Sequence, residues 1–160
     1  MWIVNLVTAV PRGEKLTLYA DTEKLEAERL SESVSLPEGI RLLESHPLSY
    51  AAFDETTLRN GDIFILKEAE IPDFIDGCLA IDAFREKYPE YTYYESDGKS
   101  YGILVWDSET GEGVLTDFIA YPEDGKAWLF FGARSVHAAG LTGTGDDAAI
   151  ALWKQLMEIN

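Results

Sequence analysis

Apolar residues near the start of the chain fall into two short runs with turn-forming residues between them. The runs cover 2–10 and 15–20, and Pro11 and Gly13 lie in the connection. Proline presets a turn dihedral angle and glycine accepts a positive φ, so this pattern predicts an N-terminal β-hairpin. A further apolar run, 63–66, contains β-branched and aromatic residues and predicts a buried strand.

Two longer segments have apolar residues at helical spacing. The first lies between Pro72, which the first turn of a helix tolerates, and Pro89, which prevents its continuation. Its apolar positions are Phe74, Cys78, Ile81, Phe84 and Tyr88. The C-terminal segment has an apolar stripe of Ile150, Trp153, Leu156 and Met157. We therefore expect helices near 72–88 and 146–159.

From Tyr91 onward the pattern changes to four strand-like runs joined by short turns. These turns lie at 96–99, 107–113 and 122–125. Connections this short join antiparallel neighbours, and Asp-Gly supplies the positive φ that a tight hairpin needs, so 91–132 is predicted to be a β-meander. A fifth strand is expected at 134–138, before a glycine-punctuated loop at 140–145.

These elements predict an α+β fold. The sheet would be mainly antiparallel, formed by the meander at 91–132 and the N-terminal hairpin, with helices near 72–88 and 146–159 packed on it. At 160 residues and 17.9 kDa the chain is close to the commonest domain size. Because no repeat, low-complexity tract or linker is visible, we expect a single domain over 1–160.

The charge balance narrows the classes of partner. Lysine and arginine together number 13, and aspartate and glutamate number 29, so the formal net charge is −16. Binding to a nucleic-acid backbone or to an anionic membrane surface needs clustered basic residues, so neither partner is expected. A basic protein is the macromolecular partner that this charge favours.

Cysteine usage and the N-terminus bear on localisation. The single cysteine, Cys78, cannot form an intramolecular disulfide, which favours a reducing compartment, and we expect a cytoplasmic protein. The apolar N-terminus lacks a basic region and is interrupted by Asn5 and Thr8, so we interpret it as a strand rather than a signal peptide. A transmembrane helix is not expected, since no apolar run reaches about 18 residues.

The predicted meander holds ten of the 19 aromatic residues of the chain. Strict strand alternation would place Tyr101, Ile103 and Val105 on one face and Leu104 and Trp106 on the other. In the same way, Leu129 and Phe131 would oppose Trp128 and Phe130. Either helices cover both faces, which is the favoured interpretation, or one face is an exposed aromatic surface.

Acidic residues accompany these aromatic residues, and residues 101–125 contain no lysine or arginine. Aromatic anchors beside an uncompensated negative charge suit a basic protein, because charge steers the encounter and Trp or Tyr supplies much of the affinity. The predicted binding residues are Asp107, Glu109, Glu112, Glu123, Asp124, Trp106, Tyr101 and Tyr121. The leading hypothesis is an acidic protein-binding module, such as an inhibitor or a toxin-immunity protein, that masks a basic partner. A nucleic-acid mimic is a variant of this hypothesis, and turns that are acidic only for solubility are the alternative interpretation.

An enzyme is the competing hypothesis. Ser135 and His137 would share a face of the strand predicted at 134–138, and Arg134 would be available to an anionic group, which suits a small hydrolase or transferase. No G-x-S-x-G motif surrounds Ser135, which favours the binding hypothesis over the enzyme.

Signals for cofactors and metals are weak. One cysteine and two distant histidines do not form a zinc site without carboxylates, and the acidic residues lack the EF-hand spacing. The loop at 140–145 lacks the lysine of a phosphate-binding P-loop, and Asp146 and Asp147 place negative charge where an anion would sit. We therefore expect neither a cofactor nor a metal.

Overall fold

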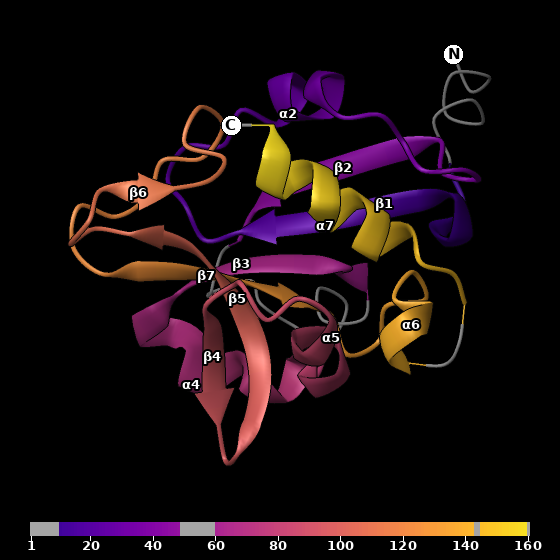
Figure 1. The fold of residues 1–160 in the computed structure, drawn as a ribbon. Helices are drawn as coiled ribbons and strands as arrows, with labels where there is room; N and C mark the ends of the chain where they lie inside the picture. The colour runs from indigo at the N-terminus through magenta and orange to yellow at the C-terminus, as the bar shows by residue number, and fades with distance from the viewer. Residues whose placement is uncertain (1–9, 49–59, 143–144, 160) are drawn as a thin grey trace.

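The computed structural model describes residues 10–48, 60–142 and 145–159, and a mixed sheet of seven strands forms its centre (Figure 1). The strands are β1 (Lys15–Ala20), β2 (Leu42–Pro47), β3 (Ile63–Lys67), β4 (Tyr93–Ser96), β5 (Lys99–Asp107), β6 (Glu112–Gly113) and β7 (Lys126–Phe131). Their order is β2-β1-β3-β7-β5-β4, and β6 pairs with the end of β5. β1 is parallel to β2 and β3, whereas the other pairs are antiparallel. The fold is α+β with a mainly antiparallel sheet, as predicted.

Short helices surround this sheet. They are α2 (Ala27–Ser33), α4 (Ile71–Phe74), α5 (Asp82–Lys87), α6 (Ala139–Thr142) and α7 (Ala148–Glu158), with 3-10 turns η1 (Arg12–Glu14), η3 (Glu68–Glu70) and η4 (Ile75–Gly77). Figure 1 shows α7 crossing one face of the sheet in front of β1 and β2. The helix predicted at 146–159 is therefore confirmed, and it begins two residues later than expected.

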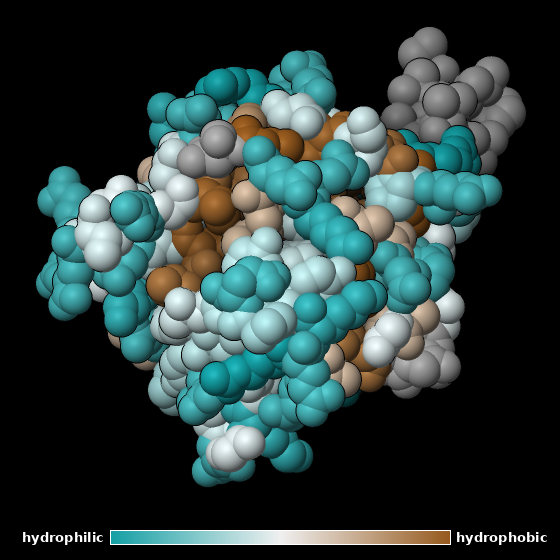
Figure 2. Space-filling view, in the orientation of Figure 1, coloured by the Kyte–Doolittle hydropathy of each residue, from teal (hydrophilic) through white to brown (hydrophobic). Residues whose placement is uncertain are grey.

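The sheet is buried on both faces. On the α7 side the core includes Ile63, Ile65, Leu129 and Phe131, and on the opposite side it includes Phe64, Leu66, Trp128 and Phe130. Each of these side chains is at most 5% exposed. The alternation predicted for β7 is confirmed, and its aromatic residues belong to the core. The face shown in Figure 2 is largely hydrophilic, with hydrophobic patches between its left end and its centre and along its upper part.

The predicted N-terminal hairpin lies partly outside the described residues, and its described part, 15–20, pairs with other strands. Residues 15–20 form β1, but β1 pairs in parallel with β2 along its length and with β3 over Leu18–Ala20. Both sides of β1 are therefore occupied at Leu18–Ala20, and residues 1–9 of the first predicted strand lie outside the described residues. The connection from β1 to β2 passes through α2, which is the kind of crossover that parallel neighbours require.

The helix predicted near 72–88 is divided into short pieces. An extended segment follows η4, where Cys78 forms a β-bridge with Gly132 and the Leu79 N–H donates to the Phe131 carbonyl (2.9 Å). The apolar residues before and after this segment pack on opposite faces of the sheet: Phe74 and Cys78 on one, Ile81, Phe84 and Tyr88 on the other. The helical spacing in the sequence therefore grouped residues that belong to opposite faces of the sheet.

The meander is confirmed for β4, β5 and β7 but not for its third run. Residues 114–121 contain no strand, the short strand β6 lies within the turn predicted at 107–113, and β5 pairs directly with β7. Residues 114–121 instead fold into turns, and Ile119 forms a bridge with Leu25. The strand predicted at 134–138 is also wrong. That segment is a turn, and its Ser135 N–H donates to the Gly132 carbonyl (3.1 Å).

Two irregularities in β5 change which face its side chains occupy. The pairing with β4 shifts at Tyr101, and the pairing with β7 shifts at Val105. Tyr101 consequently packs with Leu104 on one side, whereas Ile103, Val105 and Trp106 pack on the α7 side. Strict alternation fails here because each shift adds one unpaired residue to the strand.

Candidate functional site

The predicted acidic binding residues meet at one projecting end of the sheet. We call residues 107–113 and 122–125 the acidic tip. The Ser108 N–H donates to the Gly125 carbonyl (3.1 Å), and the Gly125 N–H donates to Ser108 Oγ (2.8 Å). The tip projects at the left of Figures 1 and 2, where its surface is hydrophilic. Two turns that are separate in the sequence thus form one surface.

All five predicted carboxylates lie on this tip. Glu109, Glu112, Glu123 and Asp124 are exposed, and Asp107 is half-buried. Asp107 has a structural role, because its Oδ1 accepts the Glu109 N–H (2.9 Å) at the start of the turn. Lys126 lies opposite Asp107 across β5 and β7 and is the nearest basic residue along the chain.

A stacked aromatic pair supports the tip. The rings of Trp106 and Tyr121 are parallel to within 4°, and their centroids are 5.4 Å apart. Trp106 Nε1 donates to the Pro122 carbonyl (3.0 Å), and the Tyr121 hydroxyl donates to the Val114 carbonyl (2.8 Å). Burial raises the pKa of the Tyr121 hydroxyl, so it remains a neutral donor at physiological pH.

The close approach of β6 to β5 at the tip needs a glycine at position 113. A Cβ on Gly113 would lie 2.6 Å from the Val105 carbonyl oxygen and 2.8 Å from the Trp106 ring.

Both rings of the stacked pair are half-buried, so each presents only part of its surface to solvent. Tyr101 does not join this group, because it packs on the other face of the sheet. The structure therefore brings together every predicted binding residue except Tyr101.

Ser135 and His137 occupy a buried junction rather than an open strand face. The Ser135 hydroxyl donates to Asp62 Oδ1 (2.7 Å) and accepts the backbone N–H of His137 (3.1 Å). Asp62 Oδ2 accepts the Thr17 N–H (2.8 Å). Ser135, His137 and Asp62 are 2%, 0% and 2% exposed. A substrate does not reach side chains this deeply buried without displacing the residues that cover them.

Both ring nitrogens of His137 contact acceptors. Nδ1 lies 2.8 Å from Asp146 Oδ1, and Nε2 lies 3.2 Å from the Arg12 carbonyl oxygen. Burial alone would lower the pKa of His137, but the hydrogen bonds to Asp146 and Arg12 and the charge of Asp62 raise it above its ordinary value. Since a carbonyl and a carboxylate accept but do not donate, the doubly protonated ring satisfies both contacts. In this arrangement neither ring nitrogen is left to take the Ser135 proton.

The junction joins segments that are distant in sequence. Besides the His137 contacts, Arg12 Nη2 donates to the Arg134 carbonyl (2.8 Å), and the Ala149 N–H donates to the His137 carbonyl (2.7 Å). A Cβ on Gly145 would lie 1.7 Å from the Val136 carbonyl oxygen, so only glycine fits at that point. No local pattern identifies Asp62 or Arg12, because their partners at the junction lie 45 to 125 residues away in the sequence.

The remaining chemical candidates have structural explanations. Cys78 is buried, and desolvation raises the pKa of its thiol to about 12, so it is not a reactive thiolate. Asp147 Oδ1 accepts the Gly140 N–H (2.7 Å), and residues 143–144 of the glycine-punctuated loop lie outside the described residues. Within the described ranges no group of three metal-ligating side chains is found, and no helix has the length and apolarity to cross a membrane.

Comparison with known proteins identifies no related protein. Searches against protein-family models, curated proteins and solved structures each found no match to the chain.

Proposed function

We propose that this protein binds a basic protein partner through the acidic tip and masks the surface that it covers, as an inhibitor or a toxin-immunity protein does. One observation carries the proposal. Hydrogen bonds between Ser108 and Gly125 join two acidic turns into one surface, on which four of the five carboxylates are exposed. Residues 101–125 contain no lysine or arginine, and Lys126 lies opposite the half-buried Asp107 at the edge of this surface. Such a surface attracts a basic partner over a longer range than direct contact.

The stacked pair gives the tip a second recognition element. Trp106 and Tyr121 are held by hydrogen bonds to main-chain carbonyls, so their orientation is fixed before a partner arrives. Aromatic side chains that are already ordered lose little conformational entropy on binding, which is why they often dominate interface energetics. Charge would therefore set the association rate, and the partly exposed rings would slow dissociation.

A charge-removal variant tests the proposal. It carries Asp107→Asn, Glu109→Gln, Glu112→Gln, Glu123→Gln and Asp124→Asn, which keep the size and the hydrogen-bonding oxygen of each side chain. The matched control replaces five exposed glutamates outside the tip by glutamine: Glu28, Glu32, Glu38, Glu68 and Glu86. Both variants have the same net charge, so any difference between them reports on position rather than on total charge.

The measurement uses a partner isolated from native lysate with the immobilised wild-type protein, followed by binding kinetics for each variant. We expect the tip variant to associate about tenfold or more slowly at low salt, and the control to stay near wild type. Equal losses in both variants, or an association rate that ignores ionic strength, would overturn the proposal. Release of the partner by duplex DNA would identify the nucleic-acid mimic as the form that this binding takes.

The enzyme hypothesis has a separate readout. His137→Ala would abolish turnover if Ser135 and His137 formed an active site, and it would leave binding at the tip intact. A turnover that depends on His137, together with a tip variant that binds normally, would replace the proposed function by the enzyme.

A further inference from the structure

A cavity of about 350 Å³ lies between α5, α6 and α7, away from the acidic tip. Its volume falls within the range of small-molecule sites, which begins at about 300 Å³. Phe84, Leu141 and Ile150 provide apolar lining, and Ala83 and Ala151 are small and exposed. The other lining residues are Lys87, Tyr88, Gly140, Asp147 and Lys154. The cavity thus combines an apolar wall with a few polar groups.

Two lysines surround one aromatic ring at this cavity. The Nζ atoms of Lys87 and Lys154 each lie 5.6 Å from the centre of the Tyr88 ring. Within the described part of the chain, neither ammonium forms an ion pair with a carboxylate. In a chain with a formal net charge of −16, two such lysines at one cavity form an unusual positive site.

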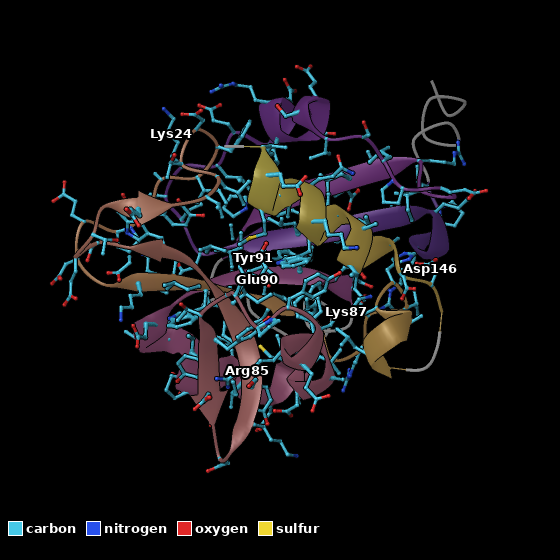
Figure 3. The ribbon with its side chains drawn as sticks, viewed as in Figure 1. Lys24, Arg85, Lys87, Glu90, Tyr91 and Asp146 are labelled. Atoms are coloured by element: carbon cyan, nitrogen blue, oxygen red, sulfur yellow. The ribbon has the colours of Figure 1, made fainter. Side chains whose placement is uncertain are left out.

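The ring between the two lysines is held firmly. Its centroid lies 4.8 Å from that of Phe84 and 5.1 Å from that of Trp153, and the backbone carbonyl of Tyr88 accepts the Tyr93 hydroxyl (2.6 Å). A hydrogen bond with Tyr88 raises the pKa of Lys154, so this ammonium remains charged. Figure 3 places Lys87 beside α7, where α5 approaches it. The ring therefore provides a fixed platform for the positive groups.

The one acidic residue of the cavity is already engaged. Asp147 Oδ1 accepts the Gly140 N–H (2.7 Å), which holds the carboxylate against the start of α6. Its negative charge would oppose an anion placed beside it, so an anionic group is favoured at Lys87 and Lys154 instead.

We propose that this cavity binds a small organic carboxylate with an aromatic or branched apolar body. The carboxylate would accept hydrogen bonds from Lys87 and Lys154, and the apolar body would lie against Phe84, Leu141 and Ile150. An ammonium has three donors, so the contacts of Lys87 and Lys154 with Tyr88 leave donors free for an anion. Burial against an apolar wall stabilises a bound hydrocarbon body but not a bare inorganic ion. This proposal does not depend on the function of the acidic tip, which shares no residue with the cavity.

Three probes separate charge from apolar contact. 4-Phenylbutyrate has both features, 4-phenylbutyramide has the apolar body without the charge, and acetate has the charge without the body. Each is titrated into the 160-residue chain and followed by two-dimensional amide NMR. We expect 4-phenylbutyrate to shift the resonances of α5, α6 and α7, and both other probes to bind about tenfold or more weakly.

Variants then assign the binding to the cavity. Lys87→Met with Lys154→Met removes both charges, and Lys24→Met with Lys99→Met is the matched control, since both of these lysines are exposed elsewhere on the protein. Ala151→Trp adds bulk at an exposed lining position without altering a core side chain. We expect the first and third variants to lose 4-phenylbutyrate binding about tenfold or more, and the control to retain it.

The proposal fails if 4-phenylbutyrate and its amide bind equally, or if the shifts persist in both Lys87→Met/Lys154→Met and Ala151→Trp. It also fails if 4-phenylbutyrate causes no shift at millimolar concentration. Melting curves of each variant show whether it is folded, and a misfolded Ala151→Trp leaves the lysine pair and its control to decide.

Discussion

The acidic tip and the His137 junction use the same kinds of side chain in opposite surroundings. At the tip, four of the five carboxylates are exposed and lie within turns that are close in sequence. At the junction, Asp62 is 2% exposed and is hydrogen-bonded to Thr17 and Ser135. A hydrated carboxylate contributes little to stability and remains available to a partner, whereas a buried one must be satisfied within the fold. The tip is therefore suited to recognition and the junction to holding the fold together.

Deleting α7, which packs beside the junction, should reduce stability far more than deleting part of the tip. Ending the chain at Asp147 removes Leu152, Trp153 and Leu156, which are at most 1% exposed. Each loses burial of about 1.5 to 3 kcal/mol, and their sum is comparable with a typical total stability of about 5 to 15 kcal/mol. We expect this truncated chain to be unfolded by circular dichroism and NMR.

A deletion at the tip is the control for this truncation. Replacing residues 108–111 by Asn-Gly shortens an exposed turn between β5 and β6 and should leave a folded protein. A truncated chain with an unchanged melting temperature would contradict the packing of α7 on the sheet.

Replacing one carboxylate by alanine in each region should give the next largest difference in the free energy of unfolding. Asp62→Ala leaves the Thr17 N–H and the Ser135 hydroxyl without their buried acceptor, and each such loss costs about 1 to 3 kcal/mol. Asp107→Ala removes one acceptor from a half-buried turn and should cost about 1 kcal/mol or less. Urea unfolding of both variants measures the difference. Equal costs would show that burial does not distinguish the two regions.

The pH dependence of stability should come from the junction. The pKa of His137 is raised above its ordinary value of 6.5 in the folded protein, so the stability that it contributes is complete below that value. This contribution is lost as pH rises through the folded pKa, because the neutral ring cannot donate to both Asp146 and the Arg12 carbonyl. Burial raises the pKa of Asp62 as well, so titration of this carboxyl also lowers stability as pH rises, but over a lower pH range than His137.

Urea unfolding at mildly acidic and mildly alkaline pH checks this prediction. Wild type should lose more free energy of unfolding between the two conditions than His137→Gln, which cannot titrate. His46 is present in both proteins and contacts Glu44 through an exposed side chain, so it serves as a common background. The same pH dependence in both proteins would show that His137 is not the titrating group.

The comparison also explains which features the sequence could predict. The C-terminal helix, β7 and the two acidic turns depend on patterns within about ten residues, and local periodicity or turn chemistry identifies them. The acidic residues of the tip could be predicted because they lie in short turns next to strands, and turn residues are usually exposed to solvent. What local pattern did not show was the hydrogen bonding between Ser108 and Gly125 that unites them.

The junction was not predictable for the converse reason. His137 contacts Arg12 across 125 residues of sequence, and Ser135 contacts Asp62 across 73. The division of the predicted helix at Cys78 has a similar origin, because its bridge to Gly132 depends on the position of β7. Contacts of this kind override a helical spacing that is present in the sequence itself.

The smallest expected effect concerns the stability of the tip itself. Neutralising Asp107, Glu109, Glu112, Glu123 and Asp124 as amides changes the formal net charge from −16 to −11, a difference of five. Four of these side chains are exposed, and Asn at position 107 keeps an acceptor for the Glu109 N–H. Relief of repulsion should therefore raise the free energy of unfolding by a few tenths of a kcal/mol, or about 1 kcal/mol at most, at low salt. The gain should disappear at high salt, where exposed charges are screened beyond about 3 Å at 1 M. Urea unfolding at both salt concentrations measures it, and a loss of stability at either would show that the tip carboxylates hold the fold together as those of the junction do.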